Sequence, residues 1–333
     1  MIGELELRAG AFTGELVSIY LGGGTPSLWQ PACIAAAIAA IRARFGGAPR
    51  EVTIEANPTD CTDDNLAAWR VAGIDRISIG VQSFEPRALA VLGRDHRFGD
   101  GRAAVARAIA AGFTTSADFI LGVPGATAGV PAIDTTADHL SIYELTIEDR
   151  TAFGKRVRDG RLVPLPEDTL AELYEGVHDL LTGAGYEHYE ISSYARPGKR
   201  AVHNALYWRG SAFLGLGVGA ASLELAPDGT GRRLTNPRRA SEYLAAPGAP
   251  AEVVACSASD LAAERAWLGL RTSSGVAERE LAAAPGLAEW LVAERLAERV
   301  SGRICPTLRG FLMADHIATR VVATWDAKLP HTG

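Results

Sequence analysis

Residues 16–27 have the sequence LVSIYLGGGTPS. The apolar run from Val17 to Leu21 is typical of a buried parallel strand. It stops at three glycines, Gly22 to Gly24, where a backbone without Cβ atoms can turn sharply and lie close to a ligand. Pro26 fixes the exit, and the small apolar residues of 31–44 predict a helix. Such a turn is where α/β proteins bind ligands, although the same triplet could form a tight turn with no ligand.

Three later segments share this pattern of a short apolar strand with a polar side chain near its end. They are residues 52–58 (VTIEANP), 76–84 (RISIGVQSF) and 117–125 (ADFILGVPG). The polar residues are Glu55, Gln82 and Asp118. Because the carboxyl ends of parallel strands open at one mouth, we expect these side chains to gather there.

The first half of the chain alternates between predicted strands and predicted helices. We predict strands at 17–21, 51–55, 76–81, 115–121 and 139–144, and helices at 31–44, 63–71, 85–92 and 100–111. Residues 1–14 predict a short helix and its exit. Strands that alternate with helices indicate an α/β fold with a parallel sheet and right-handed crossovers.

The second half contains a long helix and then a compact series of short elements. We predict a helix at 166–184, a strand and its exit at 186–194, helices at 237–245, 258–270, 277–283, 287–298 and 308–321, and a strand at 303–307. We therefore divide the chain into residues 1–235, a small winged-helix-like domain at 236–326, and a frayed tail at 327–333.

Composition excludes several classes of function. The net charge of −6 argues against a nucleic-acid surface. We expect no membrane span, since no apolar run approaches the required length of about 18 residues. The first residues lack the features of a signal peptide, so we expect a cytoplasmic protein.

The four cysteines are too widely spaced to predict a metal site. They are Cys33, Cys61, Cys256 and Cys305, and this spacing fits neither an iron–sulfur nor a zinc pattern. A disulfide framework is not expected in a reducing compartment. We predict that Cys33 and Cys305 are buried structural thiols.

The ordered motifs GGGTPS, IEANP, SIGVQSF and GVPG resemble the radical S-adenosylmethionine (SAM) superfamily. Within it the chain is similar to the oxygen-independent coproporphyrinogen oxidase branch, and most of all to the HemW family of heme chaperones, from about Leu16 to Val322. The resemblance implies a partial (β/α)6 barrel. That family carries a Cys-x3-Cys-x2-Cys motif before GGGTP, and this sequence has none. The resemblance therefore implies that the first β/α unit, with its cluster loop, is missing. Where relatives carry a helix, residues 126–136 make a poor one.

The resemblance also implies a set of SAM-binding residues on strand ends and loops: Gly23, Gly24, Thr25, Glu55, Gln82, Arg94 and Asp118. The first three would face the methionyl part of SAM. The forked guanidinium of Arg94 would pair with the SAM carboxylate. Glu55, Gln82 and Asp118 would meet the ammonium group and the ribose hydroxyls.

Each charged residue of this set also has a simpler interpretation. Arg94 could be an ordinary surface charge. Asp118 could cap a helix or form a salt bridge. Glu55 could accept a hydrogen bond within a turn.

A second candidate site is the H-N-x-x-Y-W motif, formed by His203, Asn204, Tyr207 and Trp208. It could be a half-buried aromatic strand whose histidine bonds to the backbone. By resemblance to the heme chaperones, the motif is associated with heme: an imidazole can ligate heme iron, and the aromatic rings offer flat apolar surface. Relatives usually carry another histidine near Ala221, which this chain lacks.

These motifs lead to three hypotheses. The preferred one is a heme chaperone whose complete family members bind heme, SAM and a [4Fe-4S] cluster. The alternatives are a radical SAM oxidase that decarboxylates porphyrinogen propionates, or an inactive truncated relative. Radical chemistry needs three cluster cysteines at the motif spacing, so none is expected from this chain. The expected partners are heme or a porphyrinogen and a heme-acceptor protein, with no nucleic acid.

Overall fold

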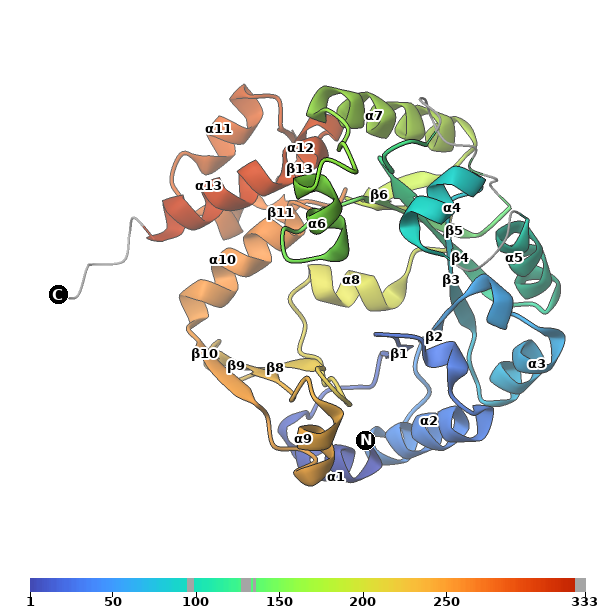
Figure 1. Cartoon of the computed structure of the whole chain (residues 1–333). Helices are drawn as coiled ribbons and strands as arrows, with labels where there is room; N and C mark the ends of the chain where they lie inside the picture. Colours follow the sequence, from blue (N-terminus) through green and yellow to red (C-terminus); the bar gives the residue numbers. More distant parts are fainter. Residues whose placement is uncertain (95–98, 127–132, 134–135, 327–333) are drawn as a thin grey trace. The chain divides into compact units, whose positions relative to one another are not determined.

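The computed structural model describes residues 1–94, 99–126, 133 and 136–326 (Figure 1). Two compact units are present. The sheet unit comprises Ile19–Ala35 and Glu51–Ala201, and the C-terminal unit comprises Met1–Ser18, Ala36–Arg50 and Val202–Gly333. The sequence-based division at residue 235 stays a prediction.

A seven-stranded sheet forms the centre of the sheet unit, in the order β1-β2-β3-β4-β5-β7-β6. Its strands are β1 (Ser18–Leu21), β2 (Glu51–Ala56), β3 (Arg76–Gln82), β4 (Thr114–Leu121), β5 (His139–Glu144), β6 (Glu187–Glu190) and β7 (Ser193–Ala195). The strands from β2 to β5 pair in parallel, and β7 pairs antiparallel with both β5 and β6. The predicted parallel α/β arrangement is confirmed.

Helices connect these strands in the predicted order, except for α6, which the sequence did not predict. They are α2 (Pro31–Phe45), α3 (Asp63–Val71), α4 (Pro86–Leu92), α5 (Asp100–Ala110), α6 (Ala152–Arg158) and α7 (Glu167–Gly183), with 3-10 turns η2 (Pro26–Leu28) and η3 (Pro58–Asp60). Local chemistry sets their ends. The Thr62 hydroxyl accepts the Asn65 amide at the start of α3, and Gly93 ends α4 in the left-handed conformation (φ 65°).

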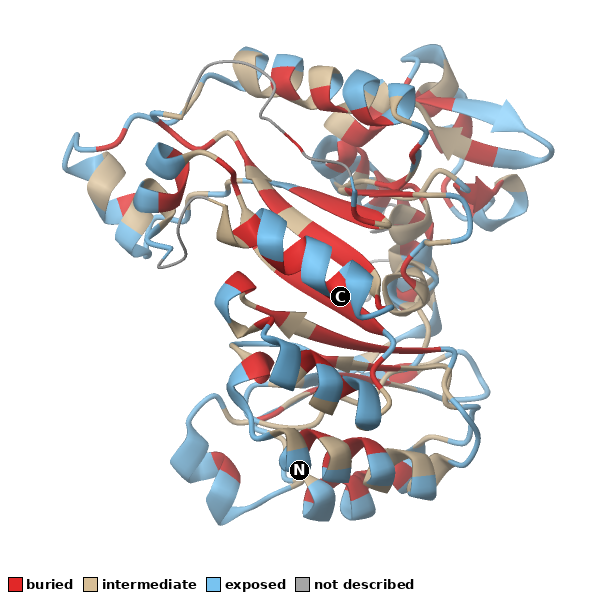
Figure 2. Cartoon of the chain, turned by 90° about the vertical axis from the view of Figure 1, so that its right-hand side faces the viewer, coloured by how far each residue is buried: buried red, intermediate tan, exposed pale blue. Residues whose placement is uncertain are grey.

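The core of the sheet unit lies along the strands, which Figure 2 shows as largely buried between helices with exposed outer faces. Ile54, Ile77 and Leu140 have no exposed surface. Strands of a parallel sheet covered by helices are apolar along most of their length. The sequence therefore predicts these strands clearly.

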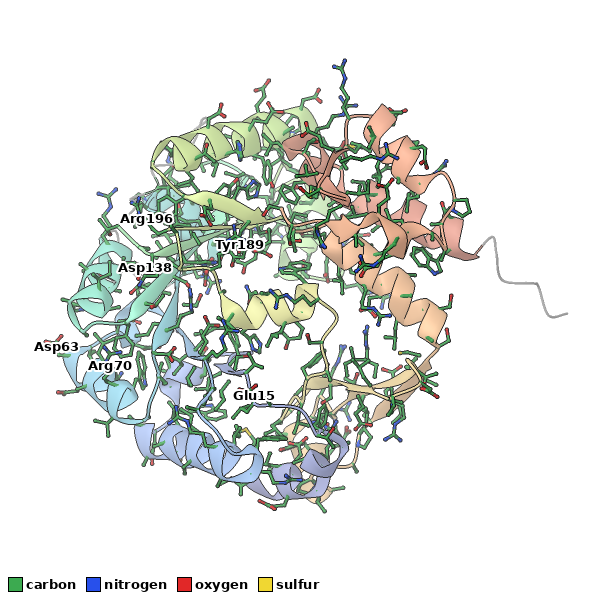
Figure 3. All side chains as sticks on the ribbon, turned by 180° about the vertical axis from the view of Figure 1, so that it is seen from behind. Glu15, Asp63, Arg70, Asp138, Tyr189 and Arg196 are labelled. Atoms are coloured by element: carbon green, nitrogen blue, oxygen red, sulfur yellow. The ribbon has the colours of Figure 1, made fainter. Side chains whose placement is uncertain are left out.

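The strand and exit predicted at 186–194 correspond to β6 and the turn after it, but the sequence did not predict that the chain reverses there into β7 and forms the β6–β7 hairpin. The hairpin is anchored to the sheet through Tyr189, which Figure 3 labels together with Arg196. The Tyr189 hydroxyl lies 2.8 Å from His139 Nε2 and accepts the Ala201 amide at 3.2 Å. A buried hydroxyl with two partners holds the hairpin in one register.

Arg76, the first residue of β3, connects four segments of the sheet unit. Its guanidinium donates to Glu51 Oε2 at 2.8 Å, to Ser116 Oγ at 2.9 Å, and to the carbonyls of Lys199 and Arg200 at 2.8 and 3.2 Å. Both side chains of the Arg76–Glu51 ion pair are 5% exposed. Such a buried charge is stable only while its partners are present.

The C-terminal unit contains two small antiparallel sheets. The first, which the sequence did not indicate, has the order β10-β9-β8 and consists of β8 (Ala221–Leu225), β9 (Gly231–Thr235) and β10 (Glu252–Cys256). The second has the order β11-β13-β12, with β11 (Val276–Ala277), β12 (Ala297–Val300) and β13 (Arg303–Pro306).

The helices of this unit include α1 (Ile2–Arg8), α8 (Val202–Trp208), α9 (Ala240–Ala245), α10 (Ala258–Gly269), α11 (Leu287–Ala293), α12 (Leu308–Leu312) and α13 (Ala314–Asp326). The helix predicted at 287–298 ends early, since Arg295 takes a left-handed conformation (φ 58°) before β12 begins. The helix predicted at 308–321 is broken at Met313.

A buried carboxylate fixes α1 within the C-terminal unit. Glu4 has no exposed surface. It accepts hydrogen bonds from Asn236 Nδ2 and the Tyr243 hydroxyl, both at 2.6 Å, and from the Gly217 amide at 2.9 Å. Arg8 Nη1 forms an ion pair with Oε1 at 3.4 Å, and together these four donors replace the water that this carboxylate loses on folding.

Several other expectations can be compared with the structure. Cys33 is exposed and Cys305 partly exposed, so the prediction that both are buried is wrong, whereas Cys61 is buried. Residues 127–132 and 134–135 of the altered segment, and the tail at 327–333, lie outside the described residues. No helix within the described part of the chain is long and apolar enough to cross a bilayer.

We expect Arg76→Met to lower the free energy of unfolding by about 3–5 kcal/mol, because Glu51 is left charged and buried without its partner. Urea unfolding followed by circular dichroism measures this loss. The control is Arg161→Met, which removes an exposed ion pair with Asp159 and should cost at most about 1 kcal/mol. Equal losses in the two variants would contradict the role given to Arg76.

Candidate functional site

The glycine turn after β1 depends on the absence of a side chain at Gly22. A Cβ atom there would lie 2.4 Å from Tyr20 Cε1 and 2.9 Å from Glu55 Oε1. Gly23 and Gly24 both take left-handed conformations, with φ of 80° and 88°. The three glycines are exposed, so the turn presents backbone atoms to solvent at the end of a buried strand.

The carboxylate of Glu55 holds this turn in place. Its Oε1 accepts the Tyr20 hydroxyl at 2.7 Å, and its Oε2 accepts the Gly23 amide at 3.2 Å. Burial, followed by the charge of Glu55, raises the pKa of the Tyr20 phenol far above its usual value, so the phenol stays a donor. Glu55 is thus part of the framework of the turn, and its predicted contact with a SAM ammonium group stays a prediction.

The exit of the turn is fixed by a second carboxylate. Ser27 Oγ, within η2, donates to Asp60 Oδ2 at 2.6 Å, and Asn57 Nδ2 lies 3.4 Å from the same oxygen. Two exposed apolar side chains, Leu28 and Trp29, follow at once. Sequence reasoning missed this pair, although their position directly after GGGTPS was the available signal.

Asp118 lies on β4 near the same carboxyl edge of the sheet. Its Oδ2 accepts the Ser78 hydroxyl at 2.9 Å, and its buried Oδ1 has no hydrogen-bond partner among the described residues. Burial raises the pKa of Asp118 to about 6, against the opposing effect of the Ser141 and Ser78 hydroxyls. The negative charge of Glu55 raises it further. A polar ligand at this edge would find a partly satisfied carboxyl group.

Gln82 ends β3 in a conformation that is rare for residues other than glycine (φ 64°). The pairing with β4 shifts register between Ile79 and Gln82. The side chain folds back over Gly80, where a Cβ atom would lie 2.7 Å from Gln82 Nε2. Backbone strain of this kind collects at ligand sites, and it could not be seen in the sequence.

The other two predicted SAM-binding residues, Thr25 and Arg94, have fewer contacts that define their position. Thr25 is partly exposed and precedes η2 directly. Arg94 is exposed, its amide donates to the Leu89 carbonyl at 3.0 Å, and it is followed by residues outside the described range. The pairing of Arg94 with a SAM carboxylate stays a prediction.

The H-N-x-x-Y-W motif forms the helix α8, so the alternative interpretation of the motif as an aromatic strand is wrong. The helix places His203 and Tyr207 on one face, since residues four apart are neighbours on a helix. Their ring centroids are 5.0 Å apart, and the ring centroids of Tyr207 and Phe213 are 4.8 Å apart. His203 Nδ1 lies 2.9 Å from the Ser18 hydroxyl, a side-chain partner where a backbone partner was expected.

Asn204 and Trp208 form a second pair at the same spacing on α8. Both are partly buried, and Trp208 Nε1 is buried without a hydrogen-bond partner within the described ranges. Tyr207 is 41% exposed, so this short helix presents an aromatic ring to solvent. Such a surface suits a flat apolar ligand.

A [4Fe-4S] cluster does not fit the described residues. Nowhere among them do three histidine, cysteine, aspartate or glutamate side chains come together as metal ligands. The thiol of Cys61 is held neutral, because burial raises its pKa to about 12.

The raised pKa of Asp118 predicts a change of stability with pH. The folded state favours the protonated carboxyl, so its stabilising contribution is complete below the unfolded pKa near 4 and is lost as the pH rises through about 6. Wild type should therefore lose stability between pH 4 and pH 7, whereas Asp118→Asn cannot ionise and should not show this loss. The difference in free energy of unfolding, variant minus wild type, should rise by roughly 2 kcal/mol over this range. Urea unfolding at both pH values measures this. Asp64→Asn, at an exposed position of α3, is the control, and an equal change in both variants would refute the prediction.

Comparison with known proteins agrees with this fold and these motifs. Residues 2–130 match the radical SAM superfamily. The heme chaperone HemW of Mycobacterium tuberculosis (strain H37Rv) is 37% identical over 327 residues, covering 94% of this chain and 83% of the relative. HemW of Escherichia coli K12 is 37% identical over 238 residues, which cover 69% of this chain and 62% of that relative. The structure of the E. coli coproporphyrinogen III oxidase HemN, a radical SAM enzyme, matches with a TM-score of 0.76 at 22% identity. The match covers 96% of this chain and 81% of that chain, and it shows a shared fold. A relative at this identity, covered over most of its length, establishes that the chain belongs to the HemW family of the radical SAM superfamily.

Proposed function

We propose that this protein is a heme chaperone, which binds heme at α8 and passes it to an acceptor protein. The name of its relatives, the heme chaperone HemW, supports this function. The observation that carries it is the helical pairing of His203 with Tyr207 on a partly exposed helix. A heme cargo needs an axial ligand and a flat apolar contact, and this pair offers both.

The partner of His203 Nδ1 supports the proposal further. A hydrogen bond at one ring nitrogen fixes the tautomer and the orientation of an imidazole, which favours ligation through the other nitrogen. The Ser18 hydroxyl, 2.9 Å away, is in position to do this. We assign Nε2 of His203 as the atom that would bind heme iron, with Tyr207 beside the macrocycle.

We further propose that the carboxyl edge of β1 to β4 binds SAM. The exposed amides of the glycine turn and the unpartnered Asp118 Oδ1 fit its polar groups. Bound SAM supplies a carboxylate, an ammonium, a sulfonium and two ribose hydroxyls. Gly23, Gly24, Thr25, Glu55, Gln82, Arg94 and Asp118 would hold them. In this chain their role is binding.

The chaperone is preferred over the coproporphyrinogen oxidase for a chemical reason. The oxidase reaction needs an iron–sulfur cluster with three thiolate ligands, which the described residues do not bring together. The likeness to HemN at 22% identity concerns the fold. Cytoplasmic location and the absence of nucleic-acid partners stay predictions.

The first test is a titration of the full chain with hemin, followed by the Soret band. We expect saturable binding with a shifted band in wild type, and loss of the shifted band in His203→Ala, with affinity reduced more than about tenfold. His316→Ala is the matched control, because His316 is an exposed histidine on α13. Unchanged binding by His203→Ala would overturn the assignment of the ligand, and no band shift in wild type would overturn the proposed function.

Removal of the aromatic neighbour should have a smaller effect. We expect Tyr207→Ala to weaken hemin affinity by about 3- to 10-fold, since an aromatic contact contributes roughly 0.5–1.5 kcal/mol. The Soret position should stay as in wild type, because the axial ligand is retained. A change in the Soret position without a change in affinity would contradict the role of Tyr207 as a packing contact.

A further inference from the structure

Two histidines of the sheet unit converge at a place that neither candidate site uses. His178 lies on α7 and His188 on β6, two elements that lie side by side in Figure 1. Their Nδ1 atoms are 3.2 Å apart, and their ring centroids 5.2 Å apart. Both side chains are partly exposed, so small solutes can reach them.

Aromatic neighbours fix the ring of His188. It stacks on Tyr194 with centroids 4.1 Å apart and an interplanar angle of 11°, and it meets the edge of Tyr174 at 6.0 Å. The imidazole therefore keeps its orientation without help from a ligand. Preorganisation of this kind lowers the cost of binding at the remaining nitrogen.

The hydrogen bonds around His188 determine which of its nitrogens carries the proton. The Tyr174 hydroxyl donates its single proton to the Ile191 carbonyl at 2.7 Å. His188 Nε2 lies 3.4 Å from that carbonyl and 3.4 Å from the Tyr174 oxygen, so both can only accept from it. In the tautomer that carries the proton on Nε2, the lone pair of Nδ1 faces His178, 3.2 Å away.

The distance between the two Nδ1 atoms fits a shared metal ion. In that tautomer of His188, Nδ1 of His178 donates to it across this distance. A zinc ion at about 2.0–2.1 Å from each nitrogen with tetrahedral angles would place the nitrogens about 3.3 Å apart, so the rings need hardly move. His178 would shift its proton to Nε2 and remain neutral.

The state of both imidazoles also favours a metal. Burial lowers the pKa of His188 to about 4, and burial lowers that of His178 against the opposing charge of Asp179. Neutral imidazoles do not have to lose a proton before they ligate. The contact of His188 Nε2 with a backbone carbonyl is the outer contact that metal-bound histidines commonly make.

We propose that His178 and His188 form a binding site for a divalent transition-metal cation of the zinc class, through Nδ1 of each, with water completing the coordination. Imidazole nitrogen suits Zn²⁺, Cu²⁺ and Ni²⁺, whereas Mg²⁺ prefers oxygen ligands. The bound ion would join α7 to the β6–β7 hairpin. This proposal is independent of heme and SAM binding.

The test is isothermal titration of ZnCl₂ into the full chain after treatment with EDTA and dialysis. We expect one saturable site in wild type, and at least about tenfold weaker binding in His178→Gln and in His188→Gln. His316→Gln, in the C-terminal unit, should bind as wild type does. MgCl₂ should give no saturable binding. Equal affinity in wild type and His178→Gln would overturn the proposal, as would no saturable zinc site in wild type.

A second measurement on the wild-type chain does not depend on how the variants fold. One equivalent of Cu²⁺ should give an electron paramagnetic resonance spectrum with hyperfine coupling to two nitrogens. Coupling to fewer than two nitrogens at one equivalent would overturn the proposal.

Discussion

The ion pair between Arg76 and Glu51 is the interaction on which the sheet unit depends. It lies at the amino ends of β2 and β3, and the same guanidinium also reaches β4 and the carbonyls of Lys199 and Arg200. A buried arginine with this many fixed acceptors sets the mutual register of strands far apart in the sequence. The opposite, carboxyl ends of the strands carry the polar residues Glu55, Gln82 and Asp118.

Those carboxyl ends combine strain with incompletely satisfied polar groups. Gln82 is held in a left-handed conformation, and one oxygen of Asp118 is buried without a partner among the described residues. Both features lower stability and persist only because the packed sheet beneath them is rigid. Glu55 differs, because its two oxygens already hold the glycine turn. A ligand there would share a carboxylate that the fold itself uses.

The sequence predicted the sheet well and the C-terminal unit poorly, for physical reasons. Buried parallel strands such as β2 and β3 are continuous apolar runs, and α3 begins at a capping residue, so both leave strong local signals. The sheet of β8 to β10 leaves little signal, because β10 is exposed along almost its whole length. The four-residue spacing of His203 and Tyr207 in H-N-x-x-Y-W is the local signal for the helix α8.

The candidate site was likewise predictable only in part. Sequence motifs located Gly23, Glu55 and His203. The hydrogen bond between Glu55 and the Gly23 amide and the one between Ser18 and His203, however, join residues that are distant in the sequence. Such contacts depend on the complete fold and cannot be derived from a local pattern. The conformation of Gln82 and the approach of His178 to His188 are of the same kind.

The close approach of Tyr20 to Gly22 constrains the order in which this protein can change. Any side chain at position 22 would collide with the Tyr20 ring and with Glu55 Oε1, so a smaller residue at position 20 would remove only the nearer of the two obstacles. A mutation at position 22 therefore needs both a change at position 20 and a shift of the Glu55 side chain, while loss of Tyr20 deprives Glu55 of a hydrogen bond. The two positions are expected to vary together, with an intermediate of reduced fitness separating the two combinations.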